Sequence, residues 1–337
     1  MKLRVGLVGL GDQWQKRHRP ALLALADRFE VRAICGEVAH LAKEAAREFD
    51  AACVDGFRAL AARDDVDAIL MLAPQWYGSL PILAACDYGK SVFCASKLAI
   101  EVEETQRVHD RIESTGIAFT LELPHRFMPA TLRLKELIAT HLGPPRVLFC
   151  HQRLSGDSVS ISGNSQLADP LLRNLVGTVD WCHYIVGHAP RSVVGLSHPS
   201  NKEAVATDYE MLSVEFPDNE TTAHDTIAQI SCGRYIDDLW PEAITFRPPA
   251  ALQVSCERGI AFVDLPANVI WFDEAGRHME SLDSERPVGE QMLSAFYRDV
   301  TSLVQPRSSL DEFYQALRVV LAARQSDRTG NRVELGG

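Results

Sequence analysis

The first fifteen residues constrain the fold of this chain more than any other stretch. Residues 3–8 form a short apolar run, which is typical of a buried strand in a parallel sheet. Gly9 and Gly11 follow at once, and a helical pattern begins near Lys16. A strand, a Gly-x-Gly turn and a helix are the context that a dinucleotide-binding fingerprint requires. In that role Gly9 permits a tight turn, and Gly11 lets the backbone approach a pyrophosphate.

The fingerprint departs from its usual pattern at the third glycine. Trp14 occupies that position, or Gln15 does if one residue is inserted. The third glycine serves close packing between helix and strand, so we expect a wider loop here. On this stretch alone, a glycine-containing turn in another kind of α/β protein remains an equal alternative.

Strand and helix patterns alternate as far as residue 122. Such alternation is typical of a doubly wound parallel sheet. The expected strands after the first are residues 31–35, 68–72, 92–94 and 117–121. The expected helices between them are residues 39–48, 56–62, 80–88 and 102–114. We therefore expect an α/β fold that begins with a Rossmann domain over residues 1–122.

After Pro129 the pattern changes to many adjacent strands with polar turns. This pattern predicts a second, α+β domain over residues 123–337, with an open and mostly antiparallel sheet. The expected strands are residues 146–153, 191–197, 211–216, 222–231, 251–256, 259–264 and 269–273. One helix, residues 130–140, precedes them, and another interrupts them, capped by Asp169, begun by Pro170 and ended by Gly187. Two helices, near 287–304 and 310–324, close the chain and can pack back on the first domain.

Composition excludes several classes of function. The chain has 337 residues and a net charge of −11, which offers no electrostatic footprint for nucleic acid. Its apolar runs fall short of the roughly 20 residues that a membrane span needs, and the first strand begins too early for a signal peptide. The eight cysteines form no Cys-x-x-Cys pair. We therefore expect a cytoplasmic protein without a metal site.

Several separate stretches together resemble one family. They are Val8-Gly-Leu-Gly11, His18-Arg-Pro-Ala-Leu22, Val66-Asp-Ala-Ile69, Ala73-Pro-Gln75, Gly89-Lys-Ser-Val92, Arg126-Phe-Met-Pro129 and residues 324–333. The chain resembles the glucose–fructose oxidoreductase, inositol dehydrogenase and rhizopine-catabolism (Gfo/Idh/MocA) family across nearly its whole length. The resemblance implies a Rossmann domain that binds NAD or NADP, and a second domain whose open sheet often forms a dimer surface. It also implies oxidation or reduction of a carbon on a sugar, a polyol or a similar small molecule.

The chain departs from this family at the residues that handle protons. Where the family usually has Glu-Lys-Pro, the sequence reads Ala95-Ser96-Lys97, so Ser96 takes the place of the catalytic lysine. The family's second catalytic segment has an Asp and a His four residues apart on a helix, with another Asp three residues on. Arg173, Gly177 and Asp180 stand at those positions. The resemblance therefore implies an altered proton relay.

Candidate catalytic residues come from these two segments. Lys97 follows a parallel strand, where ligands of open α/β sheets bind, although a surface lysine is the alternative. Arg173, Asp180 and Tyr184 fall at helical spacing on one face, and Arg173 suits an anionic substrate group. A packing face with an incidental ion pair is the alternative interpretation of that helix.

Further candidates surround the expected cofactor and substrate. His125 and Arg126 lie at the domain junction, and His183 lies near Asp180, where a core histidine is the preferred interpretation. Glu37 follows the second strand, where an acidic residue binds the adenosine ribose and selects NAD, with NADP still possible. Trp76 could stack on the nicotinamide side or pack against its helix. The expected cofactor-binding residues are Gly9, Leu10, Gly11, Asp12, Gln13, Trp14, Glu37, Ala73, Pro74, Gln75, Trp76, Ser96 and Lys97.

The sequence leaves three hypotheses for function. The first is an NAD(P)-dependent oxidoreductase that acts on a small sugar-like, polyol, carbonyl or imine substrate. The second is a catalytically silent relative that senses a ligand or serves as a scaffold. The third is non-redox hydrolysis or elimination with transient use of NAD, as some relatives perform. We also expect a homodimer or homotetramer built on the sheet of residues 146–273, whose strands are more apolar than one helix layer can cover.

Overall fold

The computed structural model describes residues 2–95, 102–154, 170–198, 208–218, 224–236, 242–243, 246, 249–283, 286–302 and 309–336. The chain divides into two compact units. The first contains residues 1–124 and 285–314, and the second contains residues 125–284 and 315–337. The 310 helix η2 (Pro124–Phe127) and the helix α11 (Ser309–Thr329) each run across a division between the units.

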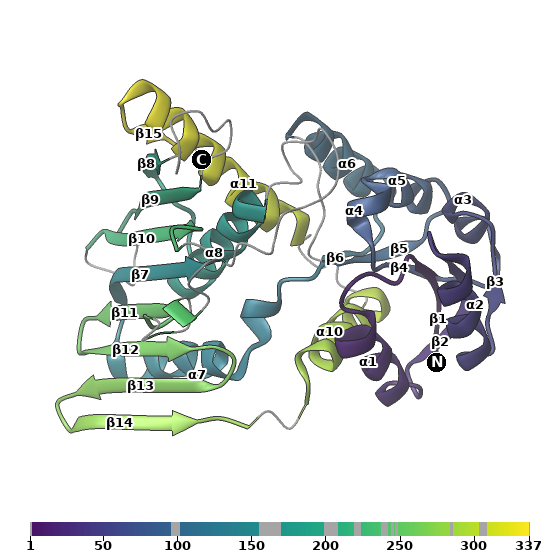
Figure 1. Cartoon of the computed structure of the whole chain (residues 1–337), viewed down its shortest axis with the longest axis horizontal. Helices are drawn as coiled ribbons and strands as arrows, with labels where there is room; N and C mark the ends of the chain where they lie inside the picture. The colour runs from purple at the N-terminus through teal and green to yellow at the C-terminus, as the bar shows by residue number, and fades with distance from the viewer. Residues whose placement is uncertain are drawn as a thin grey trace. The chain divides into compact units, whose positions relative to one another are not determined.

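The first unit is built on a six-stranded sheet with the order β3-β2-β1-β4-β5-β6 among the described strands (Figure 1). All pairs are parallel, and this is the order of a classic Rossmann sheet. The strands are β1 (Leu3–Val8), β2 (Phe29–Cys35), β3 (Ala52–Cys53), β4 (Ala68–Met71), β5 (Ser91–Cys94) and β6 (Phe119–Leu121). The expected doubly wound parallel sheet is confirmed.

Helices follow the strands of the first unit as the alternation predicts. They are the π-helix η1 (Trp14–His18), α1 (Arg19–Ala24), α2 (Ala39–Glu48), α3 (Phe57–Ala61), α4 (Pro74–Tyr77), α5 (Leu80–Asp87), α6 (Val102–Thr115) and α10 (Val288–Thr301). The edge strand β3 is exposed, but the other strands are largely buried, as in β4, where all four residues are inaccessible. Burial on both faces explains why the parallel strands read as continuous apolar runs.

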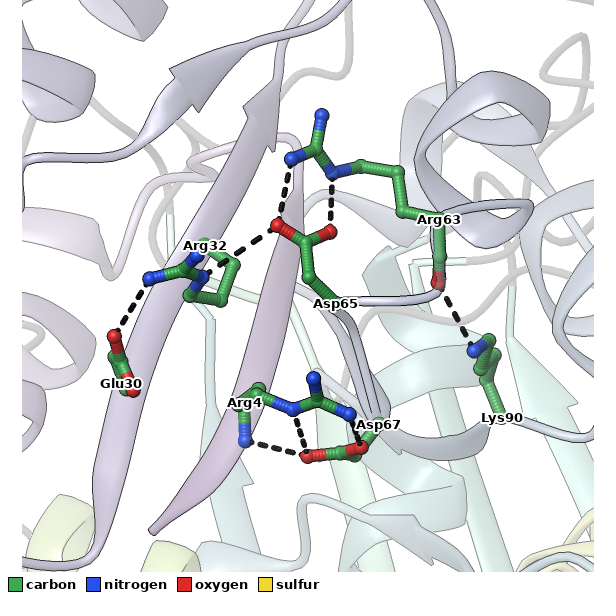
Figure 2. Close-up of polar contacts among 7 residues, drawn as sticks. All are labelled: Arg4, Glu30, Arg32, Arg63, Asp65, Asp67 and Lys90. Carbon is green, nitrogen blue, oxygen red and sulfur yellow. Dashed lines mark hydrogen bonds and ion pairs between the residues drawn. The ribbon is translucent and has the colours of Figure 1, made fainter.

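An ionic network connects the amino-terminal ends of these parallel strands (Figure 2). Arg4 of β1 donates to Asp67 from its backbone, at 3.0 Å, and from its guanidinium. Asp65 accepts two bonds from Arg63 and lies 3.5 Å from Arg32 of β2. Lys90 binds the carbonyl oxygens of two residues in the 63–66 turn, at 3.0 and 2.7 Å. This edge of the sheet is therefore joined by side chains from four segments: β1, β2, the turn of residues 63–67 before β4, and Lys90 before β5.

A second ionic group is buried near the carboxyl end of β6. The Glu122 side chain is 1% exposed and lies 2.6 Å from Arg17 Nη1 and 3.3 Å from His18 Nε2. Burial opposes ionisation of this carboxyl group, but the hydrogen bond and charge of His18 and the charge of Arg17 outweigh it and lower the pKa of Glu122 to about 2. Glu122 is therefore held as a carboxylate inside the first unit.

The second unit contains a nine-stranded sheet with the order β14-β13-β12-β11-β7-β10-β9-β8-β15 among the described strands. The pair β7–β10 is parallel and the other described pairs are antiparallel, so the expected open, mostly antiparallel sheet is confirmed. The strands are β7 (Pro145–Arg153), β8 (Ser192–His198), β9 (Tyr209–Phe216), β10 (Thr226–Gly233), β11 (Leu252–Cys256), β12 (Gly259–Asp264), β13 (Asn268–Asp273), β14 (Gly276–Ser281) and β15 (Val333–Glu334).

Helices cover one face of this sheet. The helix α8 (Pro170–Val186) packs on β7, β9 and β10, and α7 (Pro129–Leu137) packs on β12 and β13 (Figure 1). The π-helix η3 (Ile138–Leu142) continues α7. The expected helix 130–140 is α-helical only as far as Leu137 and continues as a π-helix to Leu142. Gly143 follows with a left-handed φ of 75° before β7. The expected cap Asp169 lies outside the described residues.

Side chains on the two faces of this sheet alternate as the pleat requires. Along β10, Ala228, Ile230 and Cys232 are buried beneath the helices, whereas Ile227 and Gln229 are exposed. The exposed face also carries large apolar side chains on neighbouring strands: Phe149, Val194, Leu196, Met211 and Phe272. None of the helices that the structure describes is long and apolar enough to cross a membrane.

Candidate functional site

The Gly-x-Gly turn after β1 lies directly against the end of β4. Gly9 and Gly11 have φ values of 69° and 60°, in the left-handed region that favours glycine. A Cβ atom at Gly11 would lie 2.1 Å from the carbonyl oxygen of Leu72, and one at Gly9 would lie 2.4 Å from Cβ of Ala73. Both glycines are therefore required by the backbone conformation and by the close approach of two chain segments.

Trp14 fills the position of the third glycine and begins the π-helix η1. Its side chain is 6% exposed and its ring centroid lies 5.9 Å from that of Phe49, at the end of α2. The wider loop that we expected here takes the form of this π-helical turn. An indole ring in place of glycine requires the extra space, because it packs between the turn and α2.

A cavity of about 600 Å³ opens beside this turn. Six of the expected cofactor-binding residues line it: Leu10, Gly11, Asp12, Trp14, Glu37 and Trp76. The remaining lining residues are Gln15, Arg19, Leu41, Glu44, Ala45 and Glu48, which the sequence analysis did not identify. Four of the twelve lining residues are acidic. Arg19 donates to Glu48 at 2.8 Å, so its charge is partly compensated within the cavity wall.

Glu37 is the acidic residue of this wall that lies beside the glycine turn. Its Oε2 atom would be 3.3 Å from a Cβ atom at Gly9, so the carboxylate lies against the glycine turn. Burial, together with the nearby negative charge of Glu37, raises the pKa of Tyr77 to about 12. The phenol is therefore protonated at neutral pH.

The segment after β4 supplies the other expected cofactor residues. Ala73 is the N-cap of α4, and Pro74 is buried in its first turn. The Oε1 atom of Gln75 is buried and finds no hydrogen-bond donor among the described residues. Trp76 is 63% exposed and lines the same cavity as Glu37 and residues of α2. Its role in cofactor binding stays a prediction.

These observations fit a bound dinucleotide. The glycines of the turn expose backbone atoms, and the Glu37 carboxylate lies beside them. The buried Oε1 atom of Gln75 could accept a hydrogen bond from the cofactor. Gln13 lines a neighbouring cavity of about 420 Å³ together with Lys16 and Arg17. Ser96 and Lys97 lie outside the described residues, so their roles stay predictions.

In the second unit, Asp180 of α8 is held by Arg126. The Asp180 side chain is 2% exposed and that of Arg126 is 13% exposed. Arg126 Nε donates to one carboxylate oxygen at 3.0 Å, and its Nη2 donates to the other, which is the bidentate geometry of a strong pair. The sequence predicts Asp180 as a catalytic residue and Arg126 as a substrate-binding residue. In the structure the two side chains form a buried ion pair between residues 54 positions apart.

Tyr184 lies one turn beyond Asp180, between two cations. The Arg126 guanidinium and the Lys135 ammonium each lie 5.1 Å from its ring centroid, and Lys135 Nζ donates to the Tyr184 carbonyl at 3.0 Å. Burial, with a contribution from Arg126, lowers the pKa of Lys135. Lys135 of α7 is a candidate acid–base group that the sequence analysis missed, because nothing in the spacing of α7 indicates its contact with α8.

The remaining candidates of this unit are placed around α8. The His125 ring lies 5.1 Å from that of Trp181, and its Nδ1 atom is 3.5 Å from the Gly177 carbonyl oxygen. His183 packs near Phe216, at 6.4 Å, and burial lowers its pKa, although the charge of Asp180 opposes this. This agrees with a core role for His183. Arg173 is half-buried.

The strand order, the glycine turn and the cavity define the first unit as an NAD(P)-binding Rossmann domain. Residues 3–123 match the family model GFO_IDH_MocA, described as an oxidoreductase family with an NAD-binding Rossmann fold. The first unit is therefore a Rossmann domain of the Gfo/Idh/MocA type. Among the residues that the structure describes, no group of three or more His, Cys, Asp or Glu side chains forms a metal site.

Curated relatives resemble the chain over part of their length. D-xylose 1-dehydrogenase (NADP(+)) 2 of Haloferax volcanii is 34% identical over 87 residues, which are 26% of this chain and 27% of the relative. The 2,7-anhydro-N-acetylneuraminate hydratase of Mediterraneibacter gnavus is 21% identical over 183 residues, 52% of this chain and 49% of the relative. The chain thus spans about a quarter to a half of these curated relatives.

The fold of the whole chain is shared with solved structures. The aldose-aldose oxidoreductase from Caulobacter crescentus, crystallised with glycerol, superposes with a TM-score of 0.82 over 99% of this chain and all of that one. Its sequence is 17% identical. The two-unit architecture is therefore common to both proteins.

Proposed function

We propose that the chain is an NAD-dependent oxidoreductase that acts on a small sugar-like, polyol, carbonyl or imine substrate. The observation that carries this proposal is the cavity beside the Gly9–Gly11 turn, with Glu37 in its wall. The names of the relatives support a sugar-like substrate. The bound nicotinamide cofactor would supply or accept the hydride, while this chain binds and orients the reactants.

Preference for NAD follows from charge. A 2′-phosphate would enter a cavity whose described walls carry Asp12, Glu37, Glu44 and Glu48 against Arg19, and Arg19 is already paired with Glu48. The negative charges of this wall would repel a 2′-phosphate and so disfavour NADP. The ribose hydroxyls of NAD, in contrast, can donate to the Glu37 carboxylate.

The proton relay is assigned to residues that differ from the family pattern. We propose Lys97, Asp180, Arg173 and Tyr184 as the catalytic group, with His125, Arg126 and His183 nearby in the substrate-binding domain of residues 123–337. The Arg126 pair would hold the Asp180 side chain in one orientation, since a buried carboxylate needs a fixed partner. Lys135 joins this group as a half-buried amine whose lowered pKa suits proton transfer.

The alternative is a catalytically silent relative that senses a ligand or serves as a scaffold. The pairing of Asp180 with Arg126 favours it, because the carboxylate is already engaged. Non-redox use of the cofactor is a further alternative. In either case the nucleotide site would be retained.

The test is a titration with NADH and with NADPH, followed by tryptophan fluorescence, and then a substrate screen at the nicotinamide absorbance. We expect NADH to bind at micromolar concentration and more tightly than NADPH, and a sugar or polyol to change the absorbance. Failure of both nucleotides to bind below millimolar concentration would refute the proposal. Binding without turnover of any substrate would favour the silent relative, and product without net nicotinamide change would favour non-redox chemistry.

We further propose that the protein works in the cytoplasm as a homodimer or homotetramer. All eight cysteines are free and seven are buried, which suits a reducing compartment. The exposed apolar face of the second sheet supports assembly.

A further inference from the structure

We propose that the open face of the second sheet carries a nucleophilic serine, Ser231, which takes acyl groups from esters with His151 as its general base. The activity needs no nucleotide and uses none of the residues that we assign to hydride transfer. The inference rests on a chain of hydrogen bonds between side chains on this face. The chain joins Ser231, His151, Tyr235 and Arg153.

The register of the sheet explains why Ser231 and His151 meet. The strands β7 and β10 are parallel neighbours, and His151 lies directly opposite Ser231. Both side chains are half-buried, and each follows a buried residue that points towards the helices, Cys150 and Ile230 respectively. Because side chains alternate along a strand, the pair lies on the face that the helices leave open. His151 Nδ1 is 2.8 Å from Ser231 Oγ, which is hydrogen-bond distance.

The other ring nitrogen of His151 is held by Tyr235. His151 Nε2 lies 2.7 Å from the Tyr235 hydroxyl oxygen, which also accepts a hydrogen bond from Arg153 Nε at 2.9 Å. A hydroxyl oxygen has two lone pairs, so one remains for a proton on His151 Nε2. In that tautomer Nδ1 is an acceptor, and the Ser231 hydroxyl is its donor. A nucleophile, its base and a group that orients the base therefore follow one another, as covalent catalysis requires.

The protonation state of His151 suits a general base. Burial and then the positive charge of Arg153 lower the pKa of His151 below its usual value. The Arg153 guanidinium is fixed in turn by the carbonyl oxygens of Ala243 and Phe246, each 3.4 Å from its Nη1 atom. The imidazole is therefore largely neutral at physiological pH and able to take the proton that the serine hydroxyl loses.

Apolar neighbours of the pair suit an apolar acyl group. Phe149 precedes His151 by two residues on the same face of β7, and Met211 lies opposite Ser231 on β9. Both side chains are exposed. In the reaction, Ser231 Oγ attacks the carbonyl carbon of the ester, and its proton passes to His151 Nδ1. The ester C–O bond then breaks, and the alcohol leaves with that proton. Water releases the acyl group as a carboxylic acid by the same two steps.

The test uses p-nitrophenyl butyrate with the full chain and no nucleotide. Release of p-nitrophenolate measures acylation, and peptide mass spectrometry locates the butyryl group. We expect butyrylation of Ser231, none at that position in Ser231→Ala, and an acylation rate about 10²-fold lower in His151→Gln. The matched control is Ser213→Ala on β9, because Ser213 has Gln229 and Val194 as its register partners and not a histidine. Its rate should equal that of wild type.

Tyr235 is a positioning residue, so its test is the pH profile of acylation. The wild-type rate should rise with pH to a plateau as His151 loses its proton, with a midpoint below about 6.5. Tyr235→Phe keeps the ring beside Tyr209 and removes the acceptor for His151 Nε2. We expect a plateau about tenfold lower, the loss of one hydrogen bond to a charged group. The midpoint should move to lower pH, because the imidazolium loses a partner. An unchanged profile would overturn the role of Tyr235.

The concentration of protein separates this inference from the proposed assembly, which uses the same face. Rates are measured from nanomolar to micromolar protein, and the rate per chain should fall as association covers Ser231. Butyrylation of lysines or of His151 without Ser231 at every concentration would overturn the inference, and so would equal labelling of Ser231 in His151→Gln. A monomeric chain that is butyrylated at Ser231 would support the inference and contradict only the assembly.

Discussion

Two buried carboxylates of this chain, Glu122 and Asp180, are paired with different side chains. Glu122 has a histidine and an arginine beside it, and both come from the segment that follows the glycine turn. Asp180 has a bidentate arginine from η2. In each case the sequence distance between the partners is large, so the pairing depends on the tertiary fold.

The contribution of the Glu122 carboxylate to the free energy of unfolding should depend on pH. Its pKa is lowered in the folded chain from 4.5 to about 2, so the carboxylate stabilises the fold above the unfolded pKa, and this contribution falls as the pH drops towards 2. We expect Glu122→Gln to lower the free energy of unfolding at neutral pH by about 3 kcal/mol. The difference from wild type should shrink by about 1 kcal/mol between about pH 6 and about pH 3.5.

Urea unfolding at each pH measures this difference. Glu113→Gln, on the exposed surface of α6, serves as the control and should show no such trend. A pH-independent difference for Glu122→Gln would mean that Arg17 and His18 do not stabilise its carboxylate.

Removal of the charge on Asp180 should cost stability. Asp180→Asn keeps the shape but leaves the Arg126 guanidinium without its buried counter-charge, so we expect the free energy of unfolding to fall by about 3 kcal/mol. Urea denaturation measures it. Asp225→Asn, which weakens an exposed pair with Arg191, should have little effect. Equal, small effects of both variants would contradict a structural role for the Arg126 pair. Any loss of turnover in Asp180→Asn must be compared with wild type at the same fraction of folded protein.

At the scale of elements, the glycine turn should tolerate no side chain. Gly11→Ala would place Cβ 2.1 Å from the Leu72 carbonyl oxygen at a φ of 60°, so we expect a loss of about 3 kcal/mol in unfolding free energy and loss of NADH binding. Thermal unfolding and the NADH titration measure the two effects.

Gly56 provides the matched comparison. It also has a positive φ, but nothing lies within 4 Å of its Cβ position. Gly56→Ala should therefore cost only the backbone strain, about 1–2 kcal/mol, and keep NADH affinity. Similar behaviour of the two variants would show that the approach of β4 to the turn is unimportant.

Long elements with clear periodicity could be predicted from the sequence, and short ones could not. The helix 39–48 and the strand 259–264 match their observed bounds. The two-residue strands β3 and β15, the single-turn helix α4 and the polar strand β14 were missed, because so few residues carry no period and their pairing is set by neighbours. An expected start of β10 at residue 222 is outside the described residues, and the strand begins at Thr226.

Some residues of the candidate site could likewise be predicted from the sequence, and others could not. Glu37 and the glycines could be identified because local sequence fixes their places at strand ends. The contacts of Arg126 with Asp180 and of Lys135 with Tyr184 join residues that are 54 and 49 positions apart. Spacing along one helix could place Asp180 and Tyr184 on one face but could not show what covers that face.

At the scale of the whole molecule, the open face of the second sheet predicts self-association. Phe149, Met211 and Ile227 are exposed on three adjacent strands, and such a patch is typical of an interface. We expect a dimer or tetramer by light scattering at micromolar concentration. The double variant Phe149→Glu/Ile227→Glu should be monomeric, because it places carboxylates in the centre of the patch.

Leu23→Glu is the control for this experiment. Leu23 is an exposed leucine of α1 in the first unit, so its replacement should leave the assembly intact. A monomeric wild-type protein, or dissociation by Leu23→Glu but not by the sheet variant, would show that assembly does not use this face.

The ionic network of Figure 2 has a consequence for how this chain can change over time. Arg4, Asp65, Asp67 and Lys90 secure the strands where they begin, whereas the nucleotide cavity lies where β1 and β2 end. Mutations in the cavity, which would change binding or reactivity, therefore lie at the opposite ends of the strands from the ion pairs that hold the sheet together. During evolution, a protein with this framework could replace the family's usual catalytic lysine and histidine and still fold. In the same way, most members of a laboratory library with mutations confined to the cavity should stay soluble.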